Sequence, residues 1–276
     1  MTEVAVRVPA SSANLGAGFD VFGMALGLYA DVGVGSAPDG ARQLDEHHPG
    51  RAAFDLLGGG GPIWLRSNIP MARGLGFSGA VRVAAAAVAA VQSGRPIPEA
   101  SAEILAVASE LEGHGDNVAA SLRGGVTAYV GGRAIPFRLG PVVSGAAFIA
   151  WVPDVTTSTD RSRTLLANEV ARSAAVHNIG RATQFVLALA HDDPTLLRGA
   201  TDDELHQGER LRLVPGAADA MMAGVDAGAW CAWLSGSGPT VAMLVDPASV
   251  DQVVAALPAG AHTKVLTIDT LGTRQL

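Results

Sequence analysis

Hydrophobic residues recur in short runs along the chain, and several of these runs have the pattern of β-strands. Val4 to Val8 alternates in the manner of a strand, while Ile63 to Leu65, Val126 to Val130 and Phe148 to Val152 are short and apolar. Runs of this kind, rich in β-branched and aromatic residues, are typical of strands. We predict strands at these four places and a further pair within Cys231 to Leu244, which a glycine-rich turn interrupts.

Three longer segments predict helices. Ala80 to Val91 is rich in alanine, the best helix former, and its near-total lack of polar side chains indicates a buried helix. Further helices are expected from about Ala100 to Leu111 and from Val170 to Ala190. Ser36 to Gly61 is rich in Gly, Pro, His and charge, so we predict mainly loop there. Because helices and strands mix without regular alternation, we predict an α+β fold with helices on antiparallel sheets.

The composition excludes several classes of protein. Of the 276 residues, 49% are hydrophobic and 16% are charged, which is incompatible with intrinsic disorder. The longest uninterrupted apolar run, Val83 to Val91, is too short to span a bilayer, which takes about 20 residues. We therefore expect a cytoplasmic protein with no membrane partner. The net charge is −7 and Lys264 is the only lysine, so nucleic acid is not an expected partner.

The segment Arg73 to Ala80, Arg-Gly-Leu-Gly-Phe-Ser-Gly-Ala, is the first that suggests chemistry. Glycines let the backbone approach a ligand closely, and the N-terminus of the following helix adds unsatisfied N–H donors and a positive dipole end. The hydroxyl of Ser78 could reach a phosphate oxygen or a magnesium ion. The alternative is a glycine-rich turn with a serine cap. The segment is not a Walker loop, because the Gly-Lys-Ser/Thr ending is missing.

Two other segments strengthen the interpretation as a binding site. Glu112 to Asn117 places a carboxylate, an imidazole and an Asp-Asn pair at the end of a helix and in the turn after it. Leu234 to Thr240 is a second glycine-rich loop within an apolar strand pair. A hairpin turn would explain this second loop by itself. Taken together, the two loops predict a site walled by closely approaching backbone.

These segments resemble the GHMP family of small-molecule kinases, and within it the homoserine kinases. Pro9 to Asp20 resembles the opening motif, Arg73 to Ala80 the phosphate loop, and Glu112 to Asn117 the family's Glu-Gly-His-Pro-Asp-Asn. Leu234 to Thr240 resembles the third motif. Shorter matches lie between them, at Ser158-Thr159 with Arg163, at His177 to Ala182 and at His206 to Arg210. The matches follow one another in order from residue 9 to about residue 244.

The resemblance implies a GHMP kinase fold that binds ATP and Mg²⁺. Its N-terminal nucleotide-binding domain would span residues 1–150 and its ferredoxin-like C-terminal domain residues 151–276, with the substrate between them. Ser78 and Glu112 would hold the magnesium ion, with Glu110 as the alternative if the helix register differs. The triphosphate would be cradled by Arg73, Gly74, Leu75, Gly76, Phe77, Ser78 and Gly79.

The resemblance also implies a set of residues for the amino-acid substrate: Asn14, Asp20, Asn117, Arg181 and Arg210. Their chemistry suits homoserine, because a carboxylate can hold its ammonium group and two arginines can hold its carboxylate through charge-assisted hydrogen bonds. Asn117 would orient the hydroxyl for attack on the γ-phosphate, and we expect it to be catalytic together with Glu112 and Ser78. Asp116 is the nearest candidate for a base. By themselves, both arginines could instead form surface ion pairs.

Three features depart from the family pattern. Phe77 stands where the phosphate loop usually has a serine, and Gly115 stands in the place of a proline. The stretch from Ser36 to Gly61 is also shorter than the corresponding region of typical family members, which helps form their adenine pocket. His47 to Ala53 could occupy that place in this chain. The departures concern the nucleotide residues more than the substrate residues.

The expected activity is ATP-dependent phosphorylation of the side-chain hydroxyl of L-homoserine to O-phospho-L-homoserine, a step of threonine biosynthesis. One alternative is a GHMP kinase for another small hydroxy or amino acid. Another is a catalytically degenerate relative that binds a ligand. Phe77 and the short stretch from Ser36 to Gly61 favour it, and an intact Ser78 and Glu112 oppose it. A small zwitterion is the expected partner, and a homodimer is possible.

Overall fold

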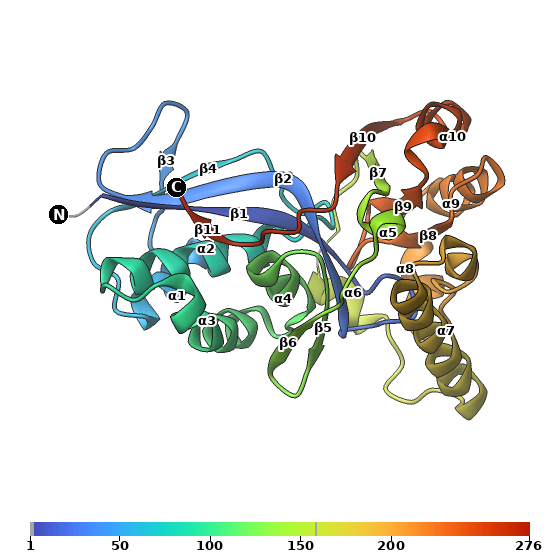
Figure 1. The fold of residues 1–276 in the computed structure, drawn as a ribbon, viewed down its shortest axis with the longest axis horizontal. Coiled ribbons are helices and arrows are strands. Elements are labelled where there is room, and N and C mark those ends of the chain that lie inside the picture. The colour runs from blue at the N-terminus through green and yellow to red at the C-terminus, as the bar shows by residue number, and fades with distance from the viewer. Residues whose placement is uncertain (1–2, 158) are drawn as a thin grey trace.

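The computed structural model describes residues 3–157 and 159–276, so Ser158 lies outside the described residues. Two antiparallel sheets lie along the long axis of the molecule (Figure 1). The larger has the order β11-β1-β2-β4-β3, with β5 paired to β2 and β6 to β5. Its strands are β1 (Val4–Ala13), β2 (Phe22–Val34), β3 (Arg42–Gln43), β4 (Ile63–Ser67), β5 (Val126–Val130), β6 (Arg133–Pro136) and β11 (Arg274–Gln275).

Four helices accompany the larger sheet: α1 (Pro49–Leu56), α2 (Phe77–Gln92), α3 (Ile97–Glu112) and α4 (Asp116–Arg123). Helices α2 and α4 contact β1 and β2, and α1 and α3 contact α2. The small side chains of α2 permit this close packing, since Ala84 to Ala87 are fully buried. The N-terminus of α2, which follows the glycine-rich loop, is therefore fixed by the core.

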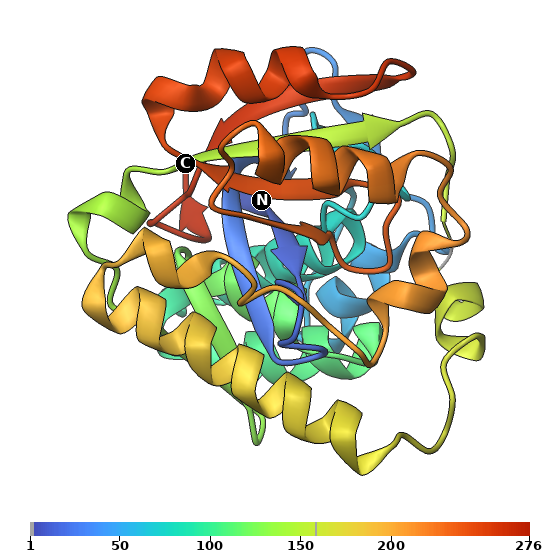
Figure 2. The same cartoon turned by 90° about the vertical axis from the view of Figure 1, so that its right-hand side faces the viewer.

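The smaller sheet has the order β10-β7-β9-β8, with bounds β7 (Ala147–Pro153), β8 (Cys231–Leu234), β9 (Val241–Val245) and β10 (Ala261–Thr267). Side chains of β7 alternate between two cores. Phe148 belongs to the core that includes Phe185 of α7 (Arg172–His191), whereas Trp151 belongs to the core that includes Ala220 of α9 (Ala217–Asp226). Helices thus cover both faces of this sheet (Figure 2).

The remaining elements are short: α5 (Pro141–Ser144), α6 (Thr159–Thr164), η1 (Pro194–Leu197), α8 (Gln207–Leu211), η2 (Pro247–Ser249) and α10 (Val250–Ala256). After β10 the chain returns to the larger sheet, where β11 pairs with β1. The division at residue 150 falls within β7 and stays a prediction. Within residues 3–157 and 159–276, no helix is both long and apolar enough to cross a membrane.

The predicted α+β class, the strands and the three helices are confirmed, and three segments contain more regular structure than expected. Pro9 to Asp20, whose polar and glycine residues predict a loop after the first strand, begins within that strand, because β1 continues to Ala13. The stretch from Ser36 to Gly61 contains β3 and α1, whose first turn uses Pro49, a residue compatible with a helix start. Asp116 and Asn117, which were expected in a turn, are the first two residues of α4.

Candidate active site

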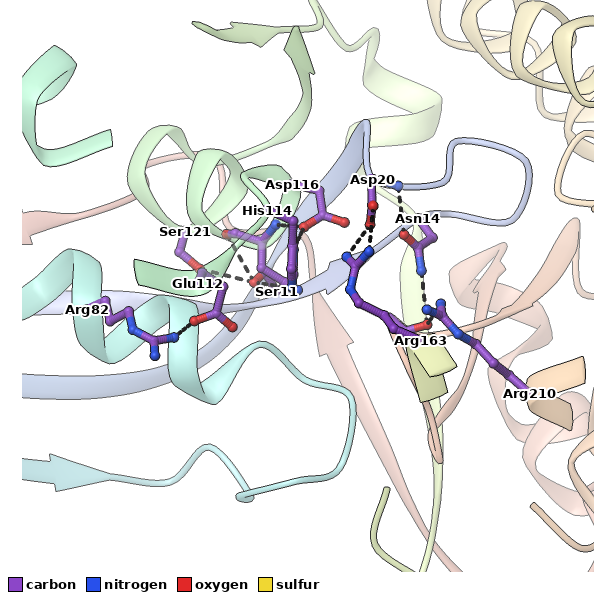
Figure 3. A network of polar contacts seen from close by, with 12 residues as sticks. Ser11, Asn14, Asp20, Arg82, Glu112, His114, Asp116, Ser121, Arg163 and Arg210 are labelled. Atoms are coloured by element: carbon purple, nitrogen blue, oxygen red, sulfur yellow. Dashed lines mark hydrogen bonds and ion pairs between the residues drawn. The ribbon is translucent and has the colours of Figure 1, made fainter. Parts of the chain in front are cut away.

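A pocket of about 540 Å³ opens where several distant segments of the chain meet. Its wall is made by the turn after β1, the glycine-rich loop before α2, the turn between α3 and α4, α6, α8, and the loop after β8. The size is in the range of small-molecule sites. Figure 3 shows the polar network of this region, with Arg82 and Glu112 at one end and Asp20, Arg163 and Arg210 at the other.

The two glycine-rich loops contact each other directly. Ser235 donates its hydroxyl to the carbonyl of Gly74 at 2.5 Å, and Thr240 donates to the carbonyl of Arg73 at 2.5 Å. Gly74 has a φ of +73°, and a Cβ there would lie 2.4 Å from the carbonyl oxygen of Ser235. Both the positive φ and the close approach require glycine at this position.

Gly76 connects the glycine-rich loop to the centre of the pocket. It is the N-cap of α2 with a φ of +68°, and a Cβ there would lie 2.2 Å from Oγ of Ser11. That serine donates to Oδ1 of Asn117 at 2.9 Å and so orients this amide. The first N–H groups of α2 have no partners within their own helix, so this helix start suits an anion.

Phe77 does not disrupt the loop. The residue is 8% exposed and belongs to the hydrophobic core of the larger sheet, with its ring edge-on to that of His48. Nδ1 of His48 caps α1 by accepting from the N–H of Gly50 at 3.2 Å, and burial lowers the pKa of His48. The pocket wall includes His48, Pro49 and Phe77, so the segment expected near the nucleotide does border the pocket.

Ser78 and Glu112 come together, as expected of two ligands for one ion, but Arg82 contacts both. Nη1 of Arg82 donates to Oγ of Ser78 at 2.5 Å and forms an ion pair with Oε2 of Glu112. Hydroxyl and carboxylate oxygens are the donor type that Mg²⁺ requires. Glu110, in contrast, is exposed and does not belong to the pocket wall.

The turn between α3 and α4 carries His114 and Asp116 into the pocket. Asp116 is 1% exposed; its Oδ1 accepts the N–H of Asn117 at 2.7 Å and lies 2.5 Å from Nδ1 of His114. A Cβ on Gly115 would lie 2.4 Å from the ring of Tyr129, so this ring explains the glycine in the place of proline. Asp116 is therefore held in place beside Asn117.

Asn14 and Asp20 form the turn after β1, both with positive φ, at +70° and +57°. The side chain of Asn14 donates to the carbonyl of Gly236 at 3.0 Å and accepts the N–H of Asp20 at 3.1 Å. Arg163 binds both carboxylate oxygens of Asp20 at 2.7 and 2.9 Å. Since Asn and Asp tolerate this backbone region better than most residues, the turn explains their presence here.

Arg210 lines the same end of the pocket, and the residue is 2% exposed. Its Nη1 donates to the carbonyl of Gly236 at 3.3 Å and to Nδ1 of His206 at 3.2 Å. Its Nε has no hydrogen-bond partner among the described residues. Burial lowers the pKa of Arg210 to about 10 and also lowers the pKa of His206. A buried guanidinium in a pocket wall suits an anionic group of a ligand.

The structure gathers most of the predicted site residues into this one pocket: Asn14, Asp20, Arg73, Gly74, Leu75, Gly76, Phe77, Ser78, Glu112, Asn117 and Arg210. Two lie outside its wall. Gly79 packs against Asn117 and Val118. The guanidinium of Arg181 donates to Gln184 at 3.1 Å, one turn along the same helix.

Two arginines of the site were not predicted as site residues. Arg163 lies in a matched segment, but its sequence context resembles that of any surface arginine. Arg82 carried a clearer signal, because a charged residue within the otherwise apolar helix from Ala80 to Val91 requires a buried partner. The sequence does not say which partner.

Comparison with known proteins agrees with the fold. The family described as GHMP kinases N terminal domain matches residues 41–125, and the family described as GHMP kinases C terminal matches residues 185–262. A protein of Desulfitobacterium hafniense named homoserine kinase is 37% identical over 273 residues, 92% of this chain and 91% of the relative. A homoserine kinase of Streptomyces coelicolor is 41% identical over 273 residues, 91% of this chain and 87% of the relative.

The chain therefore belongs to the GHMP kinase family, as its motifs predict, which makes it a small-molecule kinase that uses ATP. Among solved structures, homoserine kinase from Cytophaga hutchinsonii has a TM-score of 0.84 at 23% identity, covering 100% of this chain and 98% of that one. Mevalonate kinase of Methanococcus jannaschii has a TM-score of 0.70 at 13% identity, covering 97% and 98%. These two likenesses confirm the fold.

Proposed function

We propose that this chain transfers the γ-phosphoryl group of ATP to the side-chain hydroxyl of L-homoserine, giving O-phospho-L-homoserine for threonine biosynthesis. The observation that carries the proposal is the pairing of opposite charges at one end of the pocket. Asp20 and the buried Arg210 line the same cavity, and the anion-suited start of α2 lines another part of it. A zwitterionic amino acid placed between Asp20 and Arg210 would point its side chain towards the phosphate loop.

Asp20 and Arg210 would hold the two ends of the amino acid. A carboxylate accepts about four hydrogen bonds, so Asp20 can receive the substrate ammonium while Arg163 keeps its two contacts. Arg210 lines the pocket and would bind the substrate carboxylate through its guanidinium. Asn14 fixes the turn that carries Asp20. The substrate would thereby be held in one orientation, which is the main requirement of phosphoryl transfer.

Asn117 and Asp116 would act at the reacting hydroxyl. Ser11 holds Asn117 by its amide oxygen, so that amide has a fixed orientation in the pocket. Asp116 contacts His114 and lies in the pocket wall, where it could accept the proton of the hydroxyl as the bond to phosphorus forms. We assign Asn117 to positioning and Asp116 to proton acceptance.

The nucleotide would bind with its phosphates at the loop from Arg73 to Gly79, against the first N–H groups of α2. Ser78 and Glu112 are the residues that would hold Mg²⁺, since their oxygens converge and have the right chemistry. When bound, the ion would neutralise charge on the transferred phosphoryl group. His48 and Pro49 would border the nucleotide, in the region where the family has its adenine pocket.

The direct test is ADP release with MgATP against a panel of homoserine, threonine, serine, mevalonate and pantoate. Turnover that is selective for homoserine supports the proposal, whereas turnover of another panel member assigns the chain to a different GHMP activity. Glu112→Ala should lower turnover by about two orders of magnitude or more, because it removes stabilisation of the transferring charge. Protein that binds homoserine calorimetrically but releases no ADP with any acceptor would be a degenerate relative, and the proposal would fail.

A further inference from the structure

The two oxygens expected to bind magnesium are held by one nitrogen atom. Nη1 of Arg82 contacts both Oγ of Ser78 and Oε2 of Glu112 (Figure 3). A magnesium ion lies about 2.1 Å from its oxygen ligands. An ion bound to both oxygens would therefore lie close to Nη1, and two positive charges at such a short separation repel each other strongly.

This contact is built into the packing of the two helices. Arg82 follows Ser78 by four residues in α2, which places both side chains on the same face of the helix. Glu112 is the last residue of α3, which packs against α2. The side chains of Arg82 and Glu112 are only 17% and 13% exposed. A shielded guanidinium needs a counter-charge, and Glu112 supplies it.

We propose that Arg82 closes the metal site of this kinase and that metal binding must displace its guanidinium from Glu112 and Ser78. The inference rests on the proposed function, in which these two residues are the metal ligands. Because only the open conformation can bind the ion, the observed affinity for the metal equals the intrinsic affinity multiplied by the open fraction. Arg82 thus sets the metal concentration at which this kinase becomes active.

The test measures metal binding directly, with Mn²⁺ as the probe and electron paramagnetic resonance as the readout, in protein without nucleotide. Arg82→Met keeps the apolar stem of the side chain and removes the charge. We expect it to bind Mn²⁺ at least about ten-fold more tightly than the wild type, as for a closed state populated about ten to one. The double substitution Arg82→Met with Glu112→Gln should lose that gain, because the gain depends on the freed carboxylate.

Arg66→Gln is the matched control for the change in net charge. Arg66 forms an ion pair with Asp31 on the larger sheet, away from the pocket wall. Its substitution should change Mn²⁺ affinity less than two-fold, a limit we set as the resolution of the assay. Equal Mn²⁺ affinity of the wild type and Arg82→Met, or weaker binding by the variant, would overturn the proposal.

A second measurement uses the wild type and so does not depend on the folding of any variant. Crystals soaked with Mn²⁺ and the nucleotide should show anomalous density between Ser78 and Glu112, with the guanidinium of Arg82 moved away. Manganese at other ligands, with the Arg82 contact intact, would refute the inference. Homoserine phosphorylation measured on the same preparation separates the two failures, since the proposed function can hold while the role of Arg82 does not.

Discussion

Arg163 binds both carboxylate oxygens of Asp20, with distances of 2.7 Å from Nη2 to Oδ1 and 2.9 Å from Nη1 to Oδ2. The two side chains are 35% and 34% exposed, so solvent screens the pair and it contributes little to stability. The main effect of the pair is to orient the carboxylate of Asp20, because a guanidinium that binds both oxygens holds the carboxylate in one position in the pocket. The pair therefore fixes the orientation of the Asp20 carboxylate in the pocket wall and adds little to the stability of the fold.

Asp20→Asn should weaken substrate binding without unfolding the protein. Under the proposed function it removes the counter-charge of the ammonium group, so the KM for homoserine should rise about 10- to 100-fold, as expected for one charge-assisted hydrogen bond. Urea unfolding should show a loss of at most about 1 kcal/mol. Asp39→Asn, an exposed residue with the same change of charge, is the control. An unchanged KM would remove Asp20 from the substrate site.

Gly74→Ala should damage the junction of the two glycine-rich loops. The substitution forces a Cβ to 2.4 Å from the carbonyl oxygen of Ser235 and puts alanine at a φ of +73°. We expect a loss of about 1–3 kcal/mol in the free energy of unfolding and a lower affinity for the nucleotide. Urea titration and calorimetry with ATP measure the two effects.

Gly180→Ala is the matched control for that substitution. Gly180 lies in α7 with nothing within 4 Å of an added Cβ and no positive φ. Alanine favours a helix over glycine by roughly 1 kcal/mol, so this variant should be as stable as the wild type or more stable. Equal stability of both variants would mean that the two loops can move apart.

The sequence predicts local features of this molecule better than its long-range contacts. The glycine-rich loop and the apolar helix after it can be predicted from the sequence, because the glycine content of the one and the apolar character of the other are properties of consecutive residues. Helix α1 was missed because Pro49 and its polar neighbours indicate a loop, although the same proline suits a first helical turn. Helix α4 was missed because it spans only eight residues with few large apolar side chains.

Within the site, sequence motifs identify most of the wall but not the partners of its charges. Ser11 orients Asn117 across 106 positions of the chain, a contact that no local pattern contains. Arg163 and Arg181 are both arginines in matched segments. Tertiary packing brings the first to Asp20, whereas the second contacts Gln184 three residues along its own helix. Arg82 was visible as a charge in an apolar helix, yet its contact with Glu112 depends on the packing of α2 against α3.

The free energy of unfolding should decrease as the pH is lowered from neutral, in part because of His206. Burial lowers the pKa of His206 from its ordinary value of 6.5, so the folded protein keeps it neutral while the unfolded chain takes up a proton. Its stabilising contribution is present above pH 6.5 and is lost as the pH falls towards the folded pKa. One proton gives a slope of at most about 1.4 kcal/mol per pH unit.

Unfolding by urea between about pH 5 and pH 7.5 would measure this slope. In the neutral tautomer, Nε2 of His206 donates to the carbonyl of Gly16 at 2.9 Å and Nδ1 accepts from Arg210. Glutamine at this position cannot titrate, so His206→Gln should flatten the dependence. His262→Gln, at an exposed histidine, should leave it unchanged. A wild-type slope that matches the His206→Gln slope would contradict the prediction.

The two arginines carried over from the family motifs should differ sharply in their effect on substrate binding. Arg210 is 2% exposed in the pocket wall, whereas Arg181 lies outside that wall and contacts Gln184. Arg210→Met should therefore raise the KM for homoserine about 10- to 100-fold, and Arg181→Met less than about three-fold. Arg210→Lys should recover only part of the loss, because lysine restores the charge but not the fork that binds a carboxylate twice. Steady-state kinetics with homoserine, beside unfolding curves that show each variant to be folded, decides between the two positions. If both methionine variants lost binding equally, Arg181 would have to reach the substrate in a conformation different from this one, and the charge pairing of Asp20 with Arg210 alone would not explain how the amino acid is held.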